Sequence, residues 1–271
     1  MLLEVAAGKK AFAYTAAHEL DPAMPTVVFL HGAGLDHSWF GLQSRYFGYH
    51  GRNVLALDFP GHGRSDGPAL ATVEQLTSWV MQVLDVAKVR SASLVGHSLG
   101  SLVALECAAR YPDRVERIAL IGTAYPMKVG EGFLEAARRN EQAAYDMETI
   151  WGHAPRVPLG GNPNPGMWMY GDSLARLARL APGVLHAALK ACNDYAAGLE
   201  SAAKVKCPAL FILGERDQMT PSKAASALVK AVPDARAVAL PSGHSIMAEA
   251  PDATLDALIE FIPAPAPAKQ G

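Results

Sequence analysis

The 271-residue sequence has few cysteines and no strong excess of charge of either sign. Its three cysteines, Cys107, Cys192 and Cys207, are odd in number, widely spaced and free of any C-x-x-C pair, which argues against a disulfide framework and a zinc site. The formal net charge is −2, and no basic run occurs. Composition therefore gives no electrostatic reason to expect nucleic acid or an anionic membrane as a partner.

Long hydrophobic runs are also missing. No apolar stretch approaches the roughly 18 residues that a membrane-spanning helix needs. The N-terminal segment does not read as a signal peptide, because its apolar stretch is short and Lys9 and Lys10 follow it instead of preceding it. We therefore expect a cytoplasmic protein without a membrane span. We expect it to act on a small molecule, to need no cofactor or metal, and to exist as a monomer or homodimer.

Apolar residues make up 50% of the chain, and they fall in a regular alternation of strand-like and helix-like segments. Near-continuous apolar strands separated by helices indicate a mostly parallel sheet that is covered on both faces. The pattern predicts an α/β fold with an eight-stranded, doubly wound sheet that begins with a hairpin. The expected strands cover residues 2–6, 11–15, 26–30, 53–57, 91–95, 117–121, 209–213 and 235–240, and one well-patterned helix covers 73–86.

This alternation breaks in the middle of the chain, where no strand pattern is present and a Gly/Pro/Asn-rich loop separates helical segments. We expect a helical insertion that lies as a cap over one edge of the sheet, and a Pro/Ala-rich tail that is disordered. The predicted division is an α/β core of residues 1–124 and 205–262, a cap of 125–204 with helices at 131–150, 172–180 and 184–196, and a tail of 263–271.

The segment Gly96-His97-Ser98-Leu99-Gly100 joins a predicted strand to a predicted helix. A G-x-S-x-G pentapeptide alone arises by chance in about one chain in ten of this length. In this context, however, the serine lies on a sharp turn that exposes its hydroxyl, and the helix N-terminus points at it. The two glycines lack the Cβ atoms that would collide where strand and helix pack closely. Ser98 is therefore the candidate nucleophile.

Two other strands end in residues that complete this chemistry. The strand 209–213 is followed by Gly214-Glu215-Arg216-Asp217, and the strand 235–240 by Pro241-Ser242-Gly243-His244. Because the carboxyl ends of parallel strands meet at one edge, Ser98, Asp217 and His244 are expected together there. A serine needs an imidazole to take its proton, and a carboxylate to orient that imidazole. We predict these three as the catalytic triad.

An oxyanion hole requires two backbone N–H groups that face the developing negative charge. One is expected from Leu99, the residue after the nucleophile. The other is expected from the loop His31-Gly32-Ala33-Gly34, where we choose the N–H of Ala33.

Taken together, these segments resemble the α/β-hydrolase fold family, in its branch of small, capped, esterase-like enzymes. The likeness covers nearly the whole chain. In that family the serine, acid and histidine form the triad, and the region between the sixth and seventh strands is the cap. The resemblance thus implies those roles for Ser98, Asp217, His244 and residues 125–204. The matching segments are 31–34, 58–66, 96–100, 214–217 and 243–244.

Several other polar residues invite a structural interpretation. His97 is expected to pack or hydrogen-bond beside the nucleophile, and His31 to brace its loop. The turn at 58–66 is expected to be held by hydrogen bonds and ion pairs. Glu215 competes with Asp217 for the acid role, but family spacing favours Asp217. Cys107 is expected to be an inert core residue.

The cap carries an apolar and aromatic set that suggests a pocket for an acyl or alcohol group. Each of these side chains alone could equally bury the core of the cap. The predicted pocket residues are Met127, Met147, Trp151, Trp168, Met169 and Tyr170.

The residue at the turn restricts the reaction. An aspartate there would imply haloalkane or epoxide opening, whereas Ser98 predicts hydrolysis of a small to medium, largely apolar carboxylic ester through an acyl-enzyme. Carbon–carbon bond, lactone or thioester hydrolysis and perhydrolysis use the same triad and stay open. The neighbours His97 and Ser245 lower the carbon–carbon alternative, which often has Asn and Trp at these positions. A receptor-type protein that binds a small molecule on this fold is the alternative from another class.

Overall fold

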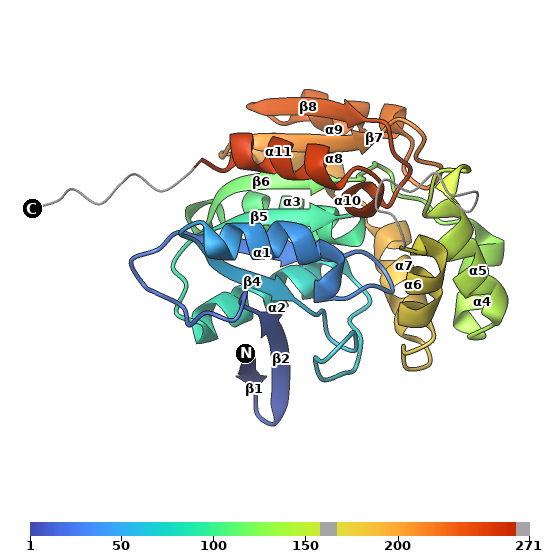
Figure 1. The fold of residues 1–271 in the computed structure, drawn as a ribbon, viewed down its shortest axis with the longest axis horizontal. Helices are drawn as coiled ribbons and strands as arrows, with labels where there is room; N and C mark the ends of the chain where they lie inside the picture. The colour runs from blue at the N-terminus through green and yellow to red at the C-terminus, as the bar shows by residue number, and fades with distance from the viewer. Residues whose placement is uncertain (158–166, 264–271) are drawn as a thin grey trace, which may run out of the picture.

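A central eight-stranded sheet organises the molecule (Figure 1). The computed structural model describes residues 1–157 and 167–263. The strand order is β1-β2-β4-β3-β5-β6-β7-β8; β1–β2 and β2–β4 pair antiparallel and all other neighbours pair parallel, which confirms the predicted α/β sheet. The strands are β1 (Leu2–Ala6), β2 (Lys9–Tyr14), β3 (Thr26–Leu30), β4 (Asn53–Leu57), β5 (Ala92–His97), β6 (Val115–Ile121), β7 (Ala209–Gly214) and β8 (Ala235–Leu240).

Strand β3 shows why the parallel strands are largely apolar. All five of its residues are buried. Because side chains alternate across a sheet, Val27 and Phe29 enter the core on one face and Val28 and Leu30 enter the core on the other. A polar residue at any of these four positions would therefore meet packed apolar side chains.

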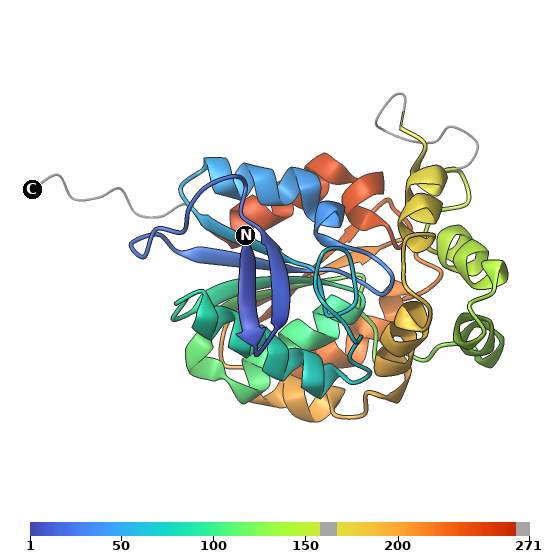
Figure 2. The ribbon, with the colours of Figure 1, turned by 90° about the horizontal axis from the view of Figure 1, so that it is seen from below.

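Helices cover both faces of the sheet (Figure 2). One face carries α1, α10 and α11, and the opposite face carries α2, α3, α8 and α9. The predicted helix 73–86 is confirmed as α2, while short α8 and α10 were not predicted. The bounds are α1 (Gly41–Tyr49), α2 (Val73–Val86), α3 (Leu99–Arg110), α8 (Gly198–Lys204), α9 (Ser226–Ala231), α10 (Ile246–Glu249) and α11 (Pro251–Phe261), with 3₁₀ turns η1 (His37–Phe40), η2 (Pro112–Arg114) and η4 (Ser222–Ala225).

Between β6 and β7, the described residues of 125–204 form helices without a strand, and they lie at the edge of the sheet where the parallel strands end (Figures 1 and 2). We call residues 125–204 the helical insertion. The single helix expected over 131–150 is instead two helices, because Asn140 between them has a positive φ of 56° that no α-helix contains. Besides α8, its helices are α4 (Glu131–Arg138), α5 (Gln142–Trp151), α6 (Met169–Leu177) and α7 (Val184–Asp194).

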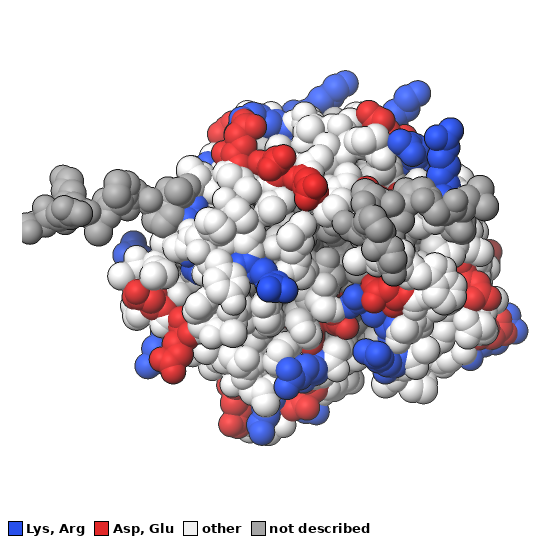
Figure 3. Space-filling model, viewed as in Figure 1, with Lys and Arg blue, Asp and Glu red and all other residues white. Residues whose placement is uncertain are grey.

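Part of the predicted loop at 152–166 and most of the predicted tail lie outside the described residues. Within the described ranges, no helix is both long and apolar enough to cross a bilayer. On the face seen in Figure 3, acidic and basic side chains are interspersed, which matches the small net charge of the sequence.

Candidate active site

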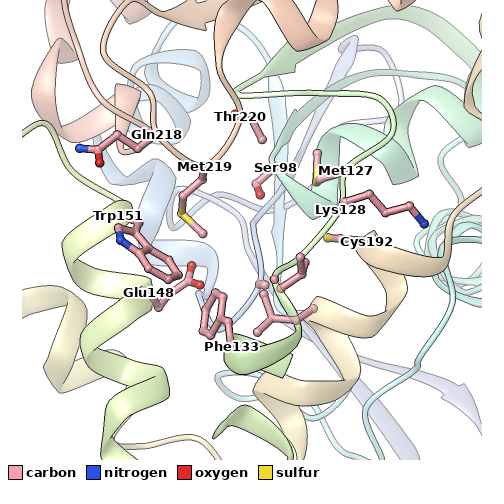
Figure 4. A pocket seen from close by; sticks show the side chains of 14 residues that line it. Ser98, Met127, Lys128, Phe133, Glu148, Trp151, Cys192, Gln218, Met219 and Thr220 are labelled. Carbon is pink, nitrogen blue, oxygen red and sulfur yellow. The ribbon is translucent and has the colours of Figure 1, made fainter. Parts of the chain in front are cut away.

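Ser98 lies on a tight, strained turn between β5 and α3. Its φ of 51° and ψ of −115° are unusual for a residue with a side chain. A Cβ on Gly96 would lie 2.1 Å from the carbonyl oxygen of Gly100, and a Cβ on Gly100 would lie 2.1 Å from that of Leu30. Glycine is therefore required at both positions. The turn places Ser98 directly before the N-terminus of α3, with its hydroxyl facing a cavity (Figure 4).

Asp217 and His244 form a buried pair at the ends of β7 and β8. The imidazole Nδ1 of His244 lies 2.8 Å from Asp217 Oδ2, and the residues are 3% and 5% exposed. Asp217 also accepts hydrogen bonds from the backbone N–H of Met219 and from the N–H and hydroxyl of Thr220. This network holds the carboxylate in one orientation toward the ring. The competing acid, Glu215, is exposed.

The pairing shifts both titrations. Burial by itself would lower the pKa of His244, but the charge and hydrogen bond of Asp217, together with the charges of Glu148 and Glu249, outweigh it and raise this pKa above 6.5. Burial would likewise raise the pKa of Asp217. The His244 charge and the hydrogen bonds from His244 and Thr220 overcome that effect and lower the pKa of this carboxyl.

His97 connects the serine turn to His244. Its Nε2 donates a hydrogen bond to the backbone carbonyl of His244 over 3.0 Å, and the two ring centroids lie 4.7 Å apart. Among the described residues, no hydrogen bond joins Ser98 Oγ directly to His244. In known enzymes, hydrogen bonds between a nucleophile and its base are often long before substrate binds. The expected structural role of His97 is thus a contact with the backbone of the candidate base.

The loop after β3 forms part of the cavity wall near Ser98. Ala33 lines the same cavity as Ser98, and its N–H donates to no acceptor among the described residues. His31 braces this loop, as expected: its Nδ1 lies 2.7 Å from the carbonyl of Gly32, and its Nε2 accepts from the N–H of Phe59. Leu99 is the first residue of α3, where backbone N–H groups have no acceptor within the helix.

A cavity of about 320 Å³ opens in front of Ser98, between the loops of the sheet edge and the helical insertion (Figure 4). Most of its lining is apolar, and the charged exceptions are Lys128 and Glu148. Of the six predicted pocket residues, Met127 and Trp151 line it. The described lining consists of Ala33, Ser98, Met127, Lys128, Val129, Gly130, Phe133, Glu148, Trp151, Leu189, Cys192, Gln218, Met219 and Thr220.

The other four predicted pocket residues lie elsewhere in the described structure. Met147 packs against the main core, and Met169 and Tyr170 belong to a small cluster with Ala154. Trp168 is 70% exposed. Helix α6 thus directs its aromatic N-terminal turn away from the cavity, and these four residues do not line it.

Glu148, Phe133 and Thr220 were not predicted as site residues. For Thr220 a signal exists in the sequence, because a threonine three residues after Asp217 can donate to that carboxylate across a turn. For Glu148 the signal is weaker: it shares one face of α5 with Ala144 and Trp151 at helical spacing. Only the position of α5 in the fold turns that face toward Ser98.

The turn after β4 has a structural role, as expected. Asp58 Oδ1 accepts from the N–H and Nδ1 of His37, and its Oδ2 accepts from the N–H of Arg64. Asp36, His37 and Asp58 lie close enough to hold a metal ion. The oxygens of Asp58 are nevertheless already engaged in holding the loop.

Cys107 is fully buried, and burial raises the pKa of its thiol to about 12, consistent with an inert core residue.

A mostly parallel sheet with a strained serine turn and an acid–histidine pair at the same edge defines the class of α/β hydrolases. The family model described as "Alpha/beta hydrolase family" matches residues 27–257. The chain therefore belongs to the alpha/beta hydrolase family.

Individual relatives cover different shares of the chain. A pimeloyl-[acyl-carrier protein] methyl ester esterase from Chromobacterium violaceum is 30% identical over 78% of this chain and 83% of its own length. The acetyltransferase component of the acetoin cleaving system from Cupriavidus necator is 39% identical over 43% of this chain, which spans only 32% of that protein. Among solved structures, the enol-lactonase from Burkholderia xenovorans LB400 superposes with a TM-score of 0.86 at 25% identity, over 97% of this chain and 99% of the lactonase.

Proposed function

We propose that the protein is a serine hydrolase that cleaves a small to medium, largely apolar carboxylic ester through an acyl-enzyme on Ser98. The observation that carries this proposal is the Asp217–His244 pair, joined at 2.8 Å and held beside the strained serine turn. This arrangement is what a serine requires to become a nucleophile near neutral pH.

The proposed mechanism follows from the hydrogen bonds. Because Nδ1 of His244 donates to Asp217, Nε2 is the ring atom that takes the proton of Ser98 as its Oγ attacks the ester carbonyl. The N–H groups of Ala33 and Leu99 stabilise the oxyanion of the tetrahedral intermediate. His244 then donates that proton to the leaving alcohol. In the second half, His244 activates a water that hydrolyses the acyl-enzyme and releases the acid and free Ser98.

The substrate class follows from the cavity. A volume of about 320 Å³ suits a small ligand, and a lining that includes Met127, Phe133 and Trp151 favours apolar groups. The methyl ester esterase and the enol-lactonase among the similar proteins support cleavage of a carboxylic ester linkage. In this proposal, residues 125–204 act as the cap that shapes the pocket.

Relatives named epoxide hydrolase and haloalkane dehalogenase also match this chain. Those reactions proceed through an alkyl ester on a carboxylate, and the nucleophile position here holds Ser98. Lactone, thioester and carbon–carbon bond hydrolysis, as well as perhydrolysis, use the same triad and are the alternatives within this mechanism. A receptor-type protein that binds a small molecule is the alternative from another class.

The decisive experiment compares the S98A variant with the unaltered protein on p-nitrophenyl esters of graded chain length. We expect S98A to lose at least about 10³-fold in kcat, as in other triad deletions. S78A, which removes a hydroxyl on α2, is the matched control and should keep full activity. Covalent labelling of Ser98 by a fluorophosphonate, together with many turnovers of the p-nitrophenyl esters, supports an enzyme. Unchanged turnover in S98A overturns the proposal, and tight binding with at most one turnover favours the receptor.

The reaction type is tested separately with a panel of ester, thioester, lactone and amide substrates, together with a carbon–carbon bond substrate and a perhydrolysis assay. The proposal predicts the highest kcat/KM on the esters. A higher value on any other bond type would replace the ester in the proposal and leave the Ser98 mechanism intact.

A further inference from the structure

Glu148 places a carboxyl group in the otherwise apolar part of the cavity. It projects from α5 toward the space in front of Ser98 (Figure 4). Its Oε2 is buried and has no hydrogen-bond partner among the described residues. Burial raises the pKa of this carboxyl to about 7. A buried polar atom without a partner is costly to folding. Because Glu148 as a whole is only half-buried, its carboxyl group is still accessible from the cavity, and a ligand there could provide a partner.

No cation in the described part of the chain pairs with Glu148. Lys128 also lines the cavity, but its Nζ donates to the backbone carbonyl of Asn193 over 2.8 Å and points away from the cavity centre (Figure 4). His244 forms its hydrogen bond with Asp217, and when its ring is protonated its charge also lowers the pKa of Glu148, although burial of Glu148 has the larger effect. While the His244 ring is neutral, the carboxyl of Glu148 therefore has no positively charged partner among the described residues.

Aromatic rings stand next to this carboxyl. Phe133 and Trp151 both line the cavity beside Glu148, with ring centroids 5.7 Å apart in an edge-to-face arrangement (Figure 4). Aromatic faces attract cations through their quadrupoles, and a carboxylate adds a hydrogen-bond acceptor. An ammonium group that carries an N–H satisfies both features at once. An uncharged alkyl group would leave the carboxyl group without a partner.

We propose that Glu148, with Phe133 and Trp151, forms a subsite for an ammonium group on an otherwise apolar ester substrate. The inference rests on the proposed function, because the ester bond must lie at Ser98 while the ammonium lies at Glu148. It narrows the substrate class from apolar esters to esters whose chain ends in a protonated amine.

The test uses paired substrates of equal shape and different charge. The p-nitrophenyl ester of 4-(dimethylammonio)butanoic acid differs from that of 5-methylhexanoic acid in having N–H⁺ where the latter has C–H. A second pair, longer by two methylene groups, allows for the distance between Ser98 and Glu148. We expect kcat/KM of the unaltered protein to favour the cationic member of at least one pair by about tenfold or more, as for a charge-assisted hydrogen bond.

The E148Q variant tests the residue itself, because it keeps the shape of the side chain and removes the charge. We expect the cationic-to-neutral ratio of kcat/KM to fall by about tenfold or more in E148Q. D146N removes an exposed charge from the same helix and is the matched control, for which the ratio stays unchanged.

The two proposals fail in different ways. Hydrolysis of the neutral esters that depends on Ser98, without any preference for the cationic members, overturns the ammonium subsite and leaves the proposed function intact. An equal effect of E148Q on both members of a pair overturns it as well. Hydrolysis that continues in S98A overturns the proposed function instead. The comparison on the unaltered protein is decisive even where E148Q does not fold.

Discussion

His97 donates a hydrogen bond from Nε2 to the backbone carbonyl of His244 over 3.0 Å. The residue before the candidate nucleophile therefore contacts the backbone of the candidate base, 147 positions further along the chain. The side chain of His97 thereby links the turn that carries Ser98 to the loop that carries His244. Burial and the neighbouring His244 keep the pKa of His97 well below 6.5, which favours the neutral form of this ring.

Loss of this contact should affect turnover more than binding. In H97F the ring shape is retained but the donor is lost, and we expect kcat to fall by about tenfold or more with little change in KM, because small displacements of a catalytic group are costly. H97Q keeps an N–H donor and should retain more of the activity. Steady-state kinetics on a p-nitrophenyl ester measure both. An equal loss in the two variants would contradict this positioning role.

Thr220 should affect kcat through its hydrogen bond to Asp217. Its hydroxyl donates to Asp217 Oδ2 over 2.6 Å and also lies 3.1 Å from Nδ1 of His244. T220V removes this donor while preserving the shape, and we expect a fall in kcat of roughly tenfold from the loss of one charge-assisted hydrogen bond. T220S keeps the hydroxyl and is the matched control. A T220V enzyme with the kcat of T220S would show that the hydroxyl is dispensable.

The pH dependence should report His244. In the proposed mechanism this residue acts as a base when neutral, and its pKa is raised from 6.5 because the charge and hydrogen bond of Asp217, with the charges of Glu148 and Glu249, outweigh the effect of burial. We therefore expect kcat/KM to rise with pH through a midpoint above 6.5, and we expect D217N to move that midpoint downward. Release of p-nitrophenol followed at its isosbestic wavelength gives the profile. A flat profile from pH 5 to 8 contradicts the role of His244.

Glu148 should make stability depend on pH. Its pKa is about 7 in the folded protein against 4.5 for a solvated glutamate, because of burial. A carboxyl with a raised folded pKa binds more protons in the folded state, so it contributes stability at low pH that is lost as the pH rises from about 4.5 to 7. E148Q removes this titration. The free energy of unfolding of E148Q minus that of the unaltered protein should therefore be larger at pH 8 than at pH 5.

Urea denaturation at the two pH values measures this gain. D146N, with its exposed carboxyl removed, should show no comparable trend. A difference between E148Q and the unaltered protein that is the same at pH 5 and pH 8 would mean that Glu148 titrates normally.

Glu106 should anchor the helical insertion to the core. This buried carboxylate on α3 accepts hydrogen bonds from Tyr195 and Ser201 over 2.7 and 2.6 Å and pairs with Arg110 at 2.6 Å. E106Q should lower the free energy of unfolding by about 1–3 kcal/mol, since hydrogen bonds to a charged group are lost. Y195F removes a single hydrogen bond and should cost less. Chemical denaturation of both variants measures the difference, and an unaltered midpoint in E106Q would contradict the anchor.

The sequence alone determined the sheet and the order of the candidate site residues. The buried strands are short apolar segments, so each can be recognised from its own residues. The sharp turn at Ser98 can be predicted from the glycines within the five-residue segment 96–100. Asp217 and His244 could be predicted because parallel strands end at one edge, which needs no knowledge of side-chain contacts. The strands, the turn and the positions of the candidate residues could therefore be predicted from short contiguous segments and from the order of the strands.

Tertiary structure decided which side chains face the cavity. The rotation of α5 and α6 about their axes and the break at Asn140 depend on how the insertion packs, and local spacing does not encode them. Packing therefore brought Met127 and Trp151 into the cavity and left Trp168 exposed. The same packing placed Glu148 in the cavity that Ser98 lines. The lining of the cavity depends on such contacts between distant segments, whereas the candidate triad could be predicted from the ends of the strands.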